Sequence, residues 1–375
     1  MPLVDSLRRI DDPRMEKKRD HILVDILVIG ICAIICGAEH WTEMEVFGRA
    51  KQSWFRSFLE LRGGIPSHDT FGRVFAIIDP KHLRQCYVDW IQGVMQGVEV
   101  RHICLDGKTV RGSRHVPSNK KAVHMISAHA REHGLVLTQE KVDDHTNEIM
   151  ALPDVLKRLT LAGAIVSIDA MGCQKEIAQQ SKEQGGEYVL SLKGNQGKLA
   201  QEAEHHFECA ERDQFVLLDH ETHTTVDGGH GRVETRRYDI IGDAGWLDPK
   251  NQWGGLAAIG RVVSKREEKC SGVKGTETRY CILSKRLTAA EFAETSRSHW
   301  GIENSLHWVL DVAFNEDACR VYAGHAAENF VILRHIALGL LKQGTRIKRG
   351  IKTRRKAAGW DEGYLLELLK GDFHA

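Results

Sequence analysis

The sequence has no paired cysteines. Its nine cysteines are scattered singly along 375 residues, and no Cys-X-X-Cys pair occurs. An odd, dispersed set excludes a disulfide framework and fits a protein kept in a reducing compartment. Without paired cysteines, the 20 histidines also lack the ligand spacing of a zinc site, so we do not expect zinc.

A long apolar segment is also missing. The longest apolar run, residues 26–36 (ILVIGICAIIC), is shorter than the roughly 20 residues that a membrane-spanning helix needs. Acidic residues (Asp20, Asp25 and Glu39) lie on both sides of it, and no small-residue cleavage site follows. We therefore interpret the run as a buried core helix and expect no targeting signal and no membrane contact.

The chain has no excess of one charge. Its net charge is +1, so the total gives no sign of a nucleic-acid partner, and any basic surface must be local. The densest basic run is residues 346–358, which indicates either a DNA contact or a solvated terminus. Hydrophobic residues make up 42% of the chain, which is ordinary for a globular protein with a large core.

Residues 1–97 are predicted to form a helical domain. Apolar residues recur every three to four positions in segments separated by Gly or Pro, near 24–36, 41–61, 67–78 and 83–96. Ser67 is the expected N-cap of the third helix. Two roles stay open for this domain: it binds DNA or dimerises, with Arg73 and Lys81 on its surface, or it is a scaffold.

At residue 98 the pattern changes to strands mixed with helices. The predicted order is three strands in a meander, a helix, a strand, a helix and a strand, at residues 98–106, 122–130, 135–142, 148–161, 164–169, from 174 onward and 188–192. Asn147 is the expected cap of the first of these helices. This order indicates a mixed α/β fold with an antiparallel edge, not a regular βαβ repeat.

A β-rich insertion is expected to follow. Alternating segments at 215–218, 233–241, 256–263 and 278–283 are separated by glycine-rich turns, and helical patterns resume near residue 289. The predicted organisation is a helical domain (1–97), a first part of an α/β core (98–206), the insertion (207–284), the last part of the core (285–345) and a basic C-terminal tail (346–375).

Two acids follow predicted strands. Asp106 ends the first strand, and Asp169 ends the fourth, just before Gly172 and a helix. If the two strands are neighbours, the carboxylates face each other at the carboxyl edge of the sheet, where open α/β sheets place ligands. Two such acids can bridge Mg²⁺, which prefers oxygen ligands, and Gly172 is expected to leave room for the metal. The alternative for Asp169 is a helix cap.

A two-metal site needs a third acid, which the helix after the insertion can supply. Within residues 299–312, Glu303 flanks an apolar stripe, with His299 and His307 four residues to either side on the same face. The stripe is expected to pack on the sheet and consists of Ile302, Leu306, Val309 and Ala313. Rival acids lie farther along the helix or past its end: Asp311, Glu316 and Asp317.

Several motifs together resemble one known family. They are LDGKTVRGS (105–113), VSIDAMGCQKEIA (166–178), YVLSLKGNQG (188–197) and HWGIENSLHWVLDVAFNEDACR (299–320), with DILVIGICAIICGAEHWTEMEVFG (25–48) and GIPSHDTFGRVFAIIDP (64–80) in the helical domain. The chain resembles bacterial insertion-sequence transposases of the DDE class, in particular the H-repeat-associated, Rhs-linked family. The resemblance covers essentially the whole chain.

The resemblance implies an RNase H-like core that carries the β-rich insertion ahead of its last catalytic helix. The family triad matches Asp106, Asp169 and Glu303, which would hold two Mg²⁺ ions, with Mn²⁺ as a substitute. The implied activity is DNA cleavage and strand transfer at the element ends, by a homodimer on double-stranded DNA in the bacterial cytoplasm, associated with the nucleoid. The chain departs from a wider superfamily signature, with Ser296 and His299 where Tyr and Arg would fall.

Further residues are expected to contact DNA. Near the acids these are Lys108, Arg111, Lys193, Asn195, His299 and Trp300, and in the basic tail Arg346, Arg349 and Arg354. Trp300 would stack on a displaced base, or it packs in the core. Two rival functions remain: an inactive or repurposed DNA-binding protein, and a metal-dependent nuclease without strand transfer.

Overall fold

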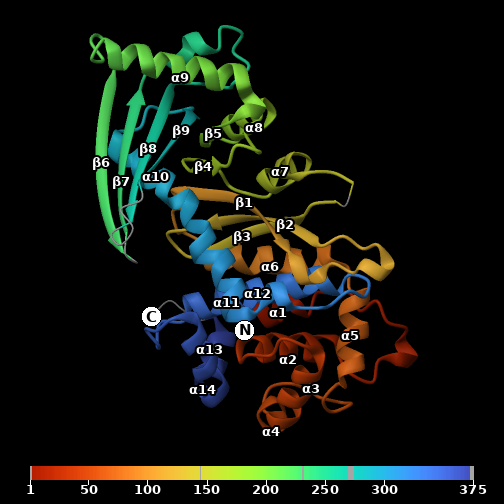
Figure 1. Ribbon diagram of the computed structural model, residues 1–375. Helices are drawn as coiled ribbons and strands as arrows, with labels where there is room; N and C mark the ends of the chain where they lie inside the picture. The colour runs from red at the N-terminus through yellow and green to blue at the C-terminus, as the bar shows by residue number, and fades with distance from the viewer. Residues whose placement is uncertain (1, 144, 230–231, 269–273, 372–375) are drawn as a thin grey trace.

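A nine-stranded mixed sheet forms the centre of the molecule (Figure 1). The structure is a computed structural model that describes residues 2–143, 145–229, 232–268 and 274–371. The strands lie side by side in the order β3-β2-β1-β4-β5-β9-β8-β7-β6. Their bounds are β1 His102–Val110, β2 Val123–Ala130, β3 Leu135–Lys141, β4 Ile165–Ile168, β5 Glu187–Leu192, β6 His220–Gly229, β7 Arg232–Ile241, β8 Ala258–Glu268 and β9 Lys274–Leu283.

Strand β1 lies between an antiparallel and a parallel neighbour. It pairs antiparallel with β2, which continues antiparallel to β3, and it pairs parallel with β4, as β4 does with β5. Helix α8 (Lys175–Glu183) makes the crossover between the parallel strands β4 and β5. The predicted mixed α/β class with an antiparallel edge is confirmed.

The β-rich segment extends this sheet and does not form a second one. Strand β9 pairs antiparallel with β5, with Val189 opposite Leu283, and β8, β7 and β6 follow in turn. The predicted strand at 215–218 is wrong, because Phe215 and Leu217 have positive φ angles of 57° and 64° and form a turn. Helix α9 (Gly197–Arg212) runs across the predicted boundary at 206/207.

Helices cover both faces of the sheet. Helix α7 (Glu148–Lys157), α8 and α9 share one apolar core with Leu105 and Ile168. On the other face, Phe292 of α10 (Ala289–Ile302) packs with Val189, and Ile302 joins a core that contains Cys104. Successive strand residues point to opposite faces, so β1 contributes to both cores. Helix α7 ends four residues before its predicted end at 161, and Asn147 occupies its N-cap position without a side-chain bond.

The N-terminal helices gather beyond β3 and pack around one long C-terminal helix (Figure 1). That helix, α12, is buried along most of its length, and the Asn329 side-chain amide donates to the carbonyls of Phe75 and Ile78 at 2.8 and 2.9 Å. Ser67 Oγ accepts from the Thr70 amide, which confirms the predicted cap. The helices are α1 Pro2–Leu7, α2 Leu23–Ile35, α3 Trp41–Ala50, α4 Gln52–Phe55, α5 His68–Ile77, α6 Pro80–Val94 and α12 Ala326–Gln343.

The basic C-terminal region is folded. It forms α13 (Ile351–Trp360) and α14 (Glu362–Lys370), which join the same core as α2 and α12. The guanidinium of Arg355 is buried and donates to the carbonyl of Ile34 at 2.7 Å. The expectation of a tail is therefore wrong for the described residues of this region. In the same described part of the chain, no helix is long and apolar enough to cross a membrane.

A buried ion pair joins the helical region to the sheet and to α12. Arg84 of α6 donates to Glu140 of β3 at 2.5 Å and to Glu328 of α12 at 2.7 Å, and its side chain is 4% exposed. Replacing one member of a buried pair leaves the other charge without compensation. This pair therefore contributes to how the three parts hold together.

We expect Arg84→Ala to lower the free energy of unfolding by about 3–5 kcal/mol, because Glu328 would remain buried without its cation. Urea denaturation of the full chain measures the change. Lys157→Ala is the control, since Lys157 pairs with Asp154 at 3.0 Å on the surface, and its loss should be much smaller. Equal losses in the two variants would contradict the structural role of Arg84.

Candidate active site

Asp106 lies inside β1 and not at its end. The parallel pairing with β4 stops at Leu105 opposite Ile168, but β1 continues along β2 to Val110, with Asp106 opposite Ser127. The expectation that β1 ends at Asp106 is wrong, because the antiparallel partner extends the strand. Asp106 is nevertheless the first residue beyond the β4 pairing.

Asp169 follows the last residue of β4, as expected. Its Oδ1 accepts hydrogen bonds from the amides of Met171 at 3.0 Å and Gly172 at 3.4 Å, so it does cap the turn that leads to α8. Since Leu105 pairs with Ile168 in parallel strands, the next residues of the two strands, Asp106 and Asp169, leave the sheet side by side. The capping role and a place beside Asp106 therefore occur together.

Glu303 approaches Asp106 of β1 from the helical segment that follows α10. Helix α10 ends at Ile302, a π-helical turn follows at Glu303–His307, and α11 (Trp308–Phe314) continues the helix. The His307 Nδ1 atom lies 3.1 Å from Glu303 Oε2 and 3.6 Å from Asp106 Oδ2. One ligand atom from each of these three residues falls within 4.8 Å of the others. Single π-helical turns are frequent at functional sites.

The π-helical turn changes the apolar stripe of this helix. The predicted stripe included Val309 and Ala313, at α-helical spacing from Ile302. In the structure, Ile302 and Leu306 are buried, but Leu310 and Phe314 follow, while Val309 and Ala313 are only partly buried. A π turn adds a residue per turn, so the buried positions recur every four residues. The expectation that Val309 and Ala313 continue the buried stripe is therefore wrong: the buried residues are Leu310 and Phe314, each one position later.

Burial dominates the electrostatics of Asp106. Burial raises the pKa of Asp106 to about 6; the His307 ring and the Gly107 amide oppose this rise, while the charges of Asp169 and Glu148 add to it. A carboxylate that is costly to ionise alone favours a bound cation. The donor set therefore fits a hard divalent ion: Asp106, Asp169 and Glu303 offer oxygen ligands, and no lysine or arginine side chain of the described residues forms an ion pair with Asp106.

The rival acids are engaged by Lys108. Lys108 belongs to β1, and its ammonium contacts Asp311 at 2.7 Å, Asp317 at 3.3 Å and Glu316 at 3.4 Å. Glu316 is fully buried, and burial raises its pKa. Among the described residues, the rival acids are not part of the group that Asp106, Glu303 and His307 form. Lys108, which was expected to contact DNA, is instead paired with these acids.

Glu148 is a further acid close to Asp106 that local sequence patterns do not reveal. Its Oε1 accepts a 2.6 Å hydrogen bond from His124 Nε2. A Cβ atom built on Gly107 would lie 2.3 Å from the same oxygen, so the residue after Asp106 must be glycine for this approach. Its position as the first residue of the helix after β3 was the only available signal, and that position alone does not indicate proximity to Asp106.

The other residues that were predicted to contact DNA near the acids differ in burial and in their partners. His299 is buried, with its Nδ1 3.1 Å from Ser167 Oγ, and burial lowers its pKa to about 4, so it is not on the surface. Trp300 is partly exposed, and the Arg279 guanidinium lies over its ring, 3.4 Å from the ring centre. Asn195 donates to the carbonyl of Ala170 at 2.5 Å, next to Asp169.

Five basic residues that were predicted to contact DNA differ in exposure. Lys193 follows β5 and is exposed, and exposed Arg111 lies 3.6 Å from Asp317. Among the C-terminal residues, Arg349 is exposed and Arg346 pairs with an acid of the same region at 2.7 Å. Arg354 differs, because its guanidinium donates to the backbone carbonyls of residues 341 and 344 at 2.7 and 3.1 Å.

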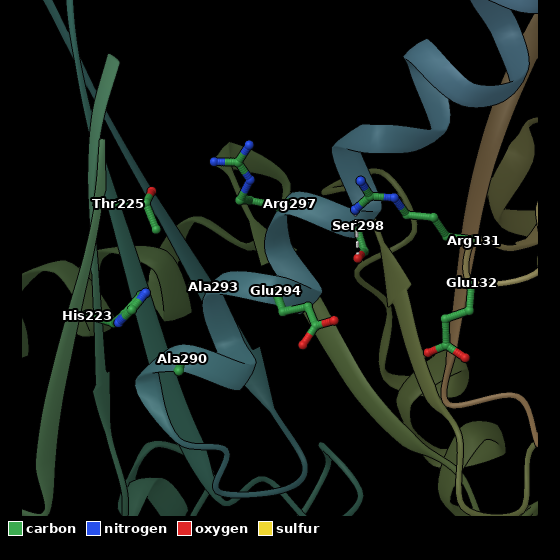
Figure 2. A pocket seen from close by; sticks show the side chains of 9 residues that line it. All are labelled: Arg131, Glu132, His223, Thr225, Ala290, Ala293, Glu294, Arg297 and Ser298. Atoms are coloured by element: carbon green, nitrogen blue, oxygen red, sulfur yellow. Dashed lines mark hydrogen bonds between the residues drawn. The ribbon is translucent and has the colours of Figure 1, made fainter. Parts of the chain in front are cut away.

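A cleft of about 510 Å³ lies beside α10, between β6 and the turn after β2 (Figure 2). Its lining carries charges of both signs, with Arg131 donating to Ser298 Oγ at 2.8 Å and Arg297 paired with Asp227. None of the three candidate acids lines it. The cleft is therefore a feature separate from the candidate active site.

The comparisons define the class of the protein. Residues 99–340 match the family model of the transposase DDE domain, and residues 4–91 match the DDE_Tnp_1-associated family. The chain belongs to the DDE transposase family.

Within that family, two relatives match nearly the whole chain. The chain is 38% identical to the "H repeat-associated putative transposase YhhI" of Escherichia coli (strain K12), over 98% of each chain. It is 39% identical to the "Putative transposase YncI" of Escherichia coli O157:H7, over 98% of this chain and 94% of that protein. A piggyBac transposase synaptic complex with hairpin DNA superposes with a TM-score of 0.47 at 9% identity, covering 100% of this chain and 80% of that chain.

Gly172 has a packing role. A Cβ atom at this position would lie 2.3 Å from Ile168 Cγ2 and 2.9 Å from Leu152 Cδ1. The expectation that Gly172 makes room for a metal is therefore wrong, because the glycine makes room for α7 against the end of β4.

We expect Gly172→Ala to lower the free energy of unfolding by about 1–3 kcal/mol, as overpacking of a core does. Urea denaturation measures the loss. Gly194→Ala is the matched control at the same sheet edge, since a Cβ atom there meets no atom within 4 Å. A Gly172→Ala variant as stable as the control would show that the contact with Ile168 relaxes without cost.

We expect Asp106→Asn to stabilise the metal-free protein at neutral pH. The folded-state pKa of Asp106, about 6, lies above its usual value of 3.8, so the wild type loses stability as the pH rises from about 4 to about 6. The variant should unfold with a free energy up to about 3 kcal/mol higher at pH 7.5, and the gain should shrink toward pH 5. Urea titrations with a chelator at several pH values measure it.

Asp239→Asn is the control of opposite sign. Burial raises the pKa of Asp239, but Arg261 at 2.9 Å and Arg237 outweigh it and hold that pKa below its usual value. This variant should therefore lose stability at neutral pH. A gain for Asp106→Asn that does not change with pH would contradict the assigned pKa.

Proposed function

We propose that the protein is an active DDE transposase, which cleaves DNA and joins strands at the ends of its insertion sequence with divalent metal ions. One observation carries this proposal. Strand pairing sets Asp106 beside Asp169 at one sheet edge, and Glu303, from a distant part of the chain, comes within reach of Asp106 through His307. Membership of the DDE transposase family supports the same assignment.

The core is proposed to be RNase H-like. The support is the strand order β3-β2-β1-β4-β5 with an antiparallel meander and two parallel strands, and a helix that brings the last acid after the β-rich segment. The proposed organisation keeps the helical region (1–97) as a separate functional part, although it shares a core with α12.

The mechanism assigns each acid a holding role. Bound Mg²⁺ or Mn²⁺, two ions per site, would lower the pKa of the attacking oxygen and stabilise the charge that develops on the phosphate. Asp106, Asp169 and Glu303 would hold the ions. The chain fixes each of these carboxylates by a different local element: Asp106 by β1, Asp169 by its turn amides and Glu303 by the π-helical turn.

The DNA contacts are proposed to lie at the same edge. Lys193 and Arg111 are exposed after β5 and β1, where cations would contact backbone phosphates. Arg349 and the exposed lysines of α13 are a second basic surface. We further propose that a homodimer holds both element ends on chromosomal DNA in the bacterial cytoplasm.

We expect Asp106→Ala, Asp169→Ala and Glu303→Ala each to lower DNA cleavage by on the order of 10³-fold or more, because each removes a metal-holding group. The assay incubates each purified variant with labelled DNA carrying the inverted repeats that flank the gene, with Mg²⁺ or Mn²⁺. DNA binding, measured by mobility shift with a chelator present, should persist in all three variants.

Asp311→Asn is the matched control, because Asp311 contacts Lys108 and not the candidate site. It should cleave far better than the three alanine variants. Robust cleavage by Glu303→Ala would overturn the assignment of the third acid. DNA binding by the wild type with no nicking in either metal would favour an inactive DNA-binding protein, and cut products without joined products would favour a nuclease.

A further inference from the structure

One ring nitrogen of His307 lies near two of the candidate metal-holding acids. Its side chain is 5% exposed, and its Nδ1 lies between Glu303 Oε2 and Asp106 Oδ2. The other ring nitrogen, Nε2, is buried and has no hydrogen-bond partner among the described residues. The polar contacts of the ring are therefore to the two carboxylates.

Hydrogen bonding explains only part of this arrangement. The 3.1 Å contact with Glu303 is compatible with a hydrogen bond, but 3.6 Å to Asp106 is too long for one. Two adjacent ligands of an octahedral ion, each about 2.1 Å from it, lie roughly 3 Å apart, and ligands farther around the ion are more widely separated. Both distances fit ligands that share one ion.

The backbone also favours this role. In the π-helical turn, Glu303 and His307 are the first and last residues, so both side chains leave the same side of the helix toward β1. Two further buried histidines, His129 and His335, lie close enough for the charge of His307 to act on them. They are not part of the group whose ligand atoms come together, which contains only His307 as a nitrogen donor among the described residues.

We propose that His307 Nδ1 is a direct ligand of the divalent ion held by Asp106 and Glu303, and that this nitrogen makes the site select Mn²⁺ over Mg²⁺. The inference rests on the metal site of the proposed function. Magnesium strongly prefers oxygen ligands, whereas the larger, softer Mn²⁺ accepts an imidazole nitrogen more readily. A site of oxygen ligands alone would lack this source of selectivity.

The test is electron spin echo envelope modulation on the full chain loaded with Mn²⁺, without DNA. The wild type should give the modulation of a directly bound ¹⁴N nucleus, and His307→Asn should lose it while still binding Mn²⁺. His299→Asn is the matched control, because His299 is a buried histidine that contacts Ser167 and, among the described residues, is not part of the group of Asp106, Glu303 and His307. Its ¹⁴N signal should match that of the wild type.

Competition between Mn²⁺ and Mg²⁺ gives a second readout, independent of activity. His307→Asn should weaken Mn²⁺ binding by about 10-fold or more and Mg²⁺ binding much less, because the amide oxygen of asparagine suits Mg²⁺. Equal changes for the two metals would mean that His307 only orients Glu303, which overturns the proposal.

The outcomes distinguish a failure of the proposed role of His307 from a failure of the metal site. A wild-type Mn²⁺ spectrum without ¹⁴N coupling, or a signal lost in His299→Asn and kept in His307→Asn, overturns the role of His307 and leaves the proposed function standing. Mn²⁺ affinity that is unchanged in Asp106→Asn and in Glu303→Gln would remove the metal site itself, and the proposed function with it. Thermal unfolding of each metal-free variant checks that it is folded.

Discussion

The parallel pairing of β1 with β4 is the constraint on which the candidate site depends. It sets Leu105 opposite Ile168, and both side chains are buried in the core under α7 and α8. Because side chains alternate along a strand, Asp106 then points to the other face, toward α10 and α11. A slip of one residue in β1 would turn Asp106 toward α7 and bury Leu105 under the wrong helices. The apolar core thus fixes the direction of the acid.

That direction has a cost in stability. Burial and the charge of Asp169 make ionised Asp106 unfavourable without a cation, and the nearby His307 ring offsets part of this cost. The rest of the fold offsets the cost by extensive apolar packing, with α12 buried among the N-terminal helices. Strained or poorly solvated charges are expected at functional sites, where they favour the ligand that is to be bound.

Local patterns in the sequence were enough to predict the pair of acids and the class of fold, because a buried strand followed by an acid is a short-range signal. They were not enough where contacts with distant segments determine the length of a strand or the partner of a side chain. Strand β1 runs past Asp106 since β2 pairs with it, and Lys108 is neutralised by acids about 200 residues later. The π-helical turn was also not predicted. Apolar residues stand at both Val309 and Leu310, and only packing selects which of the two continues the buried stripe.

The β-rich segment explains how the third acid is positioned. Since its strands continue the core sheet through β5, α10 lies across both halves, in contact with β1 and β4 at one end and with β6 and β7 at the other. The ring of Phe292 occupies the space that Gly260 of β8 leaves, where a Cβ atom would lie 2.4 Å from the ring. Helix α10 is thereby fixed about three turns before Glu303. A segment that interrupts the sequence between Asp169 and Glu303 thus serves, in the folded chain, to hold Glu303 at the sheet edge.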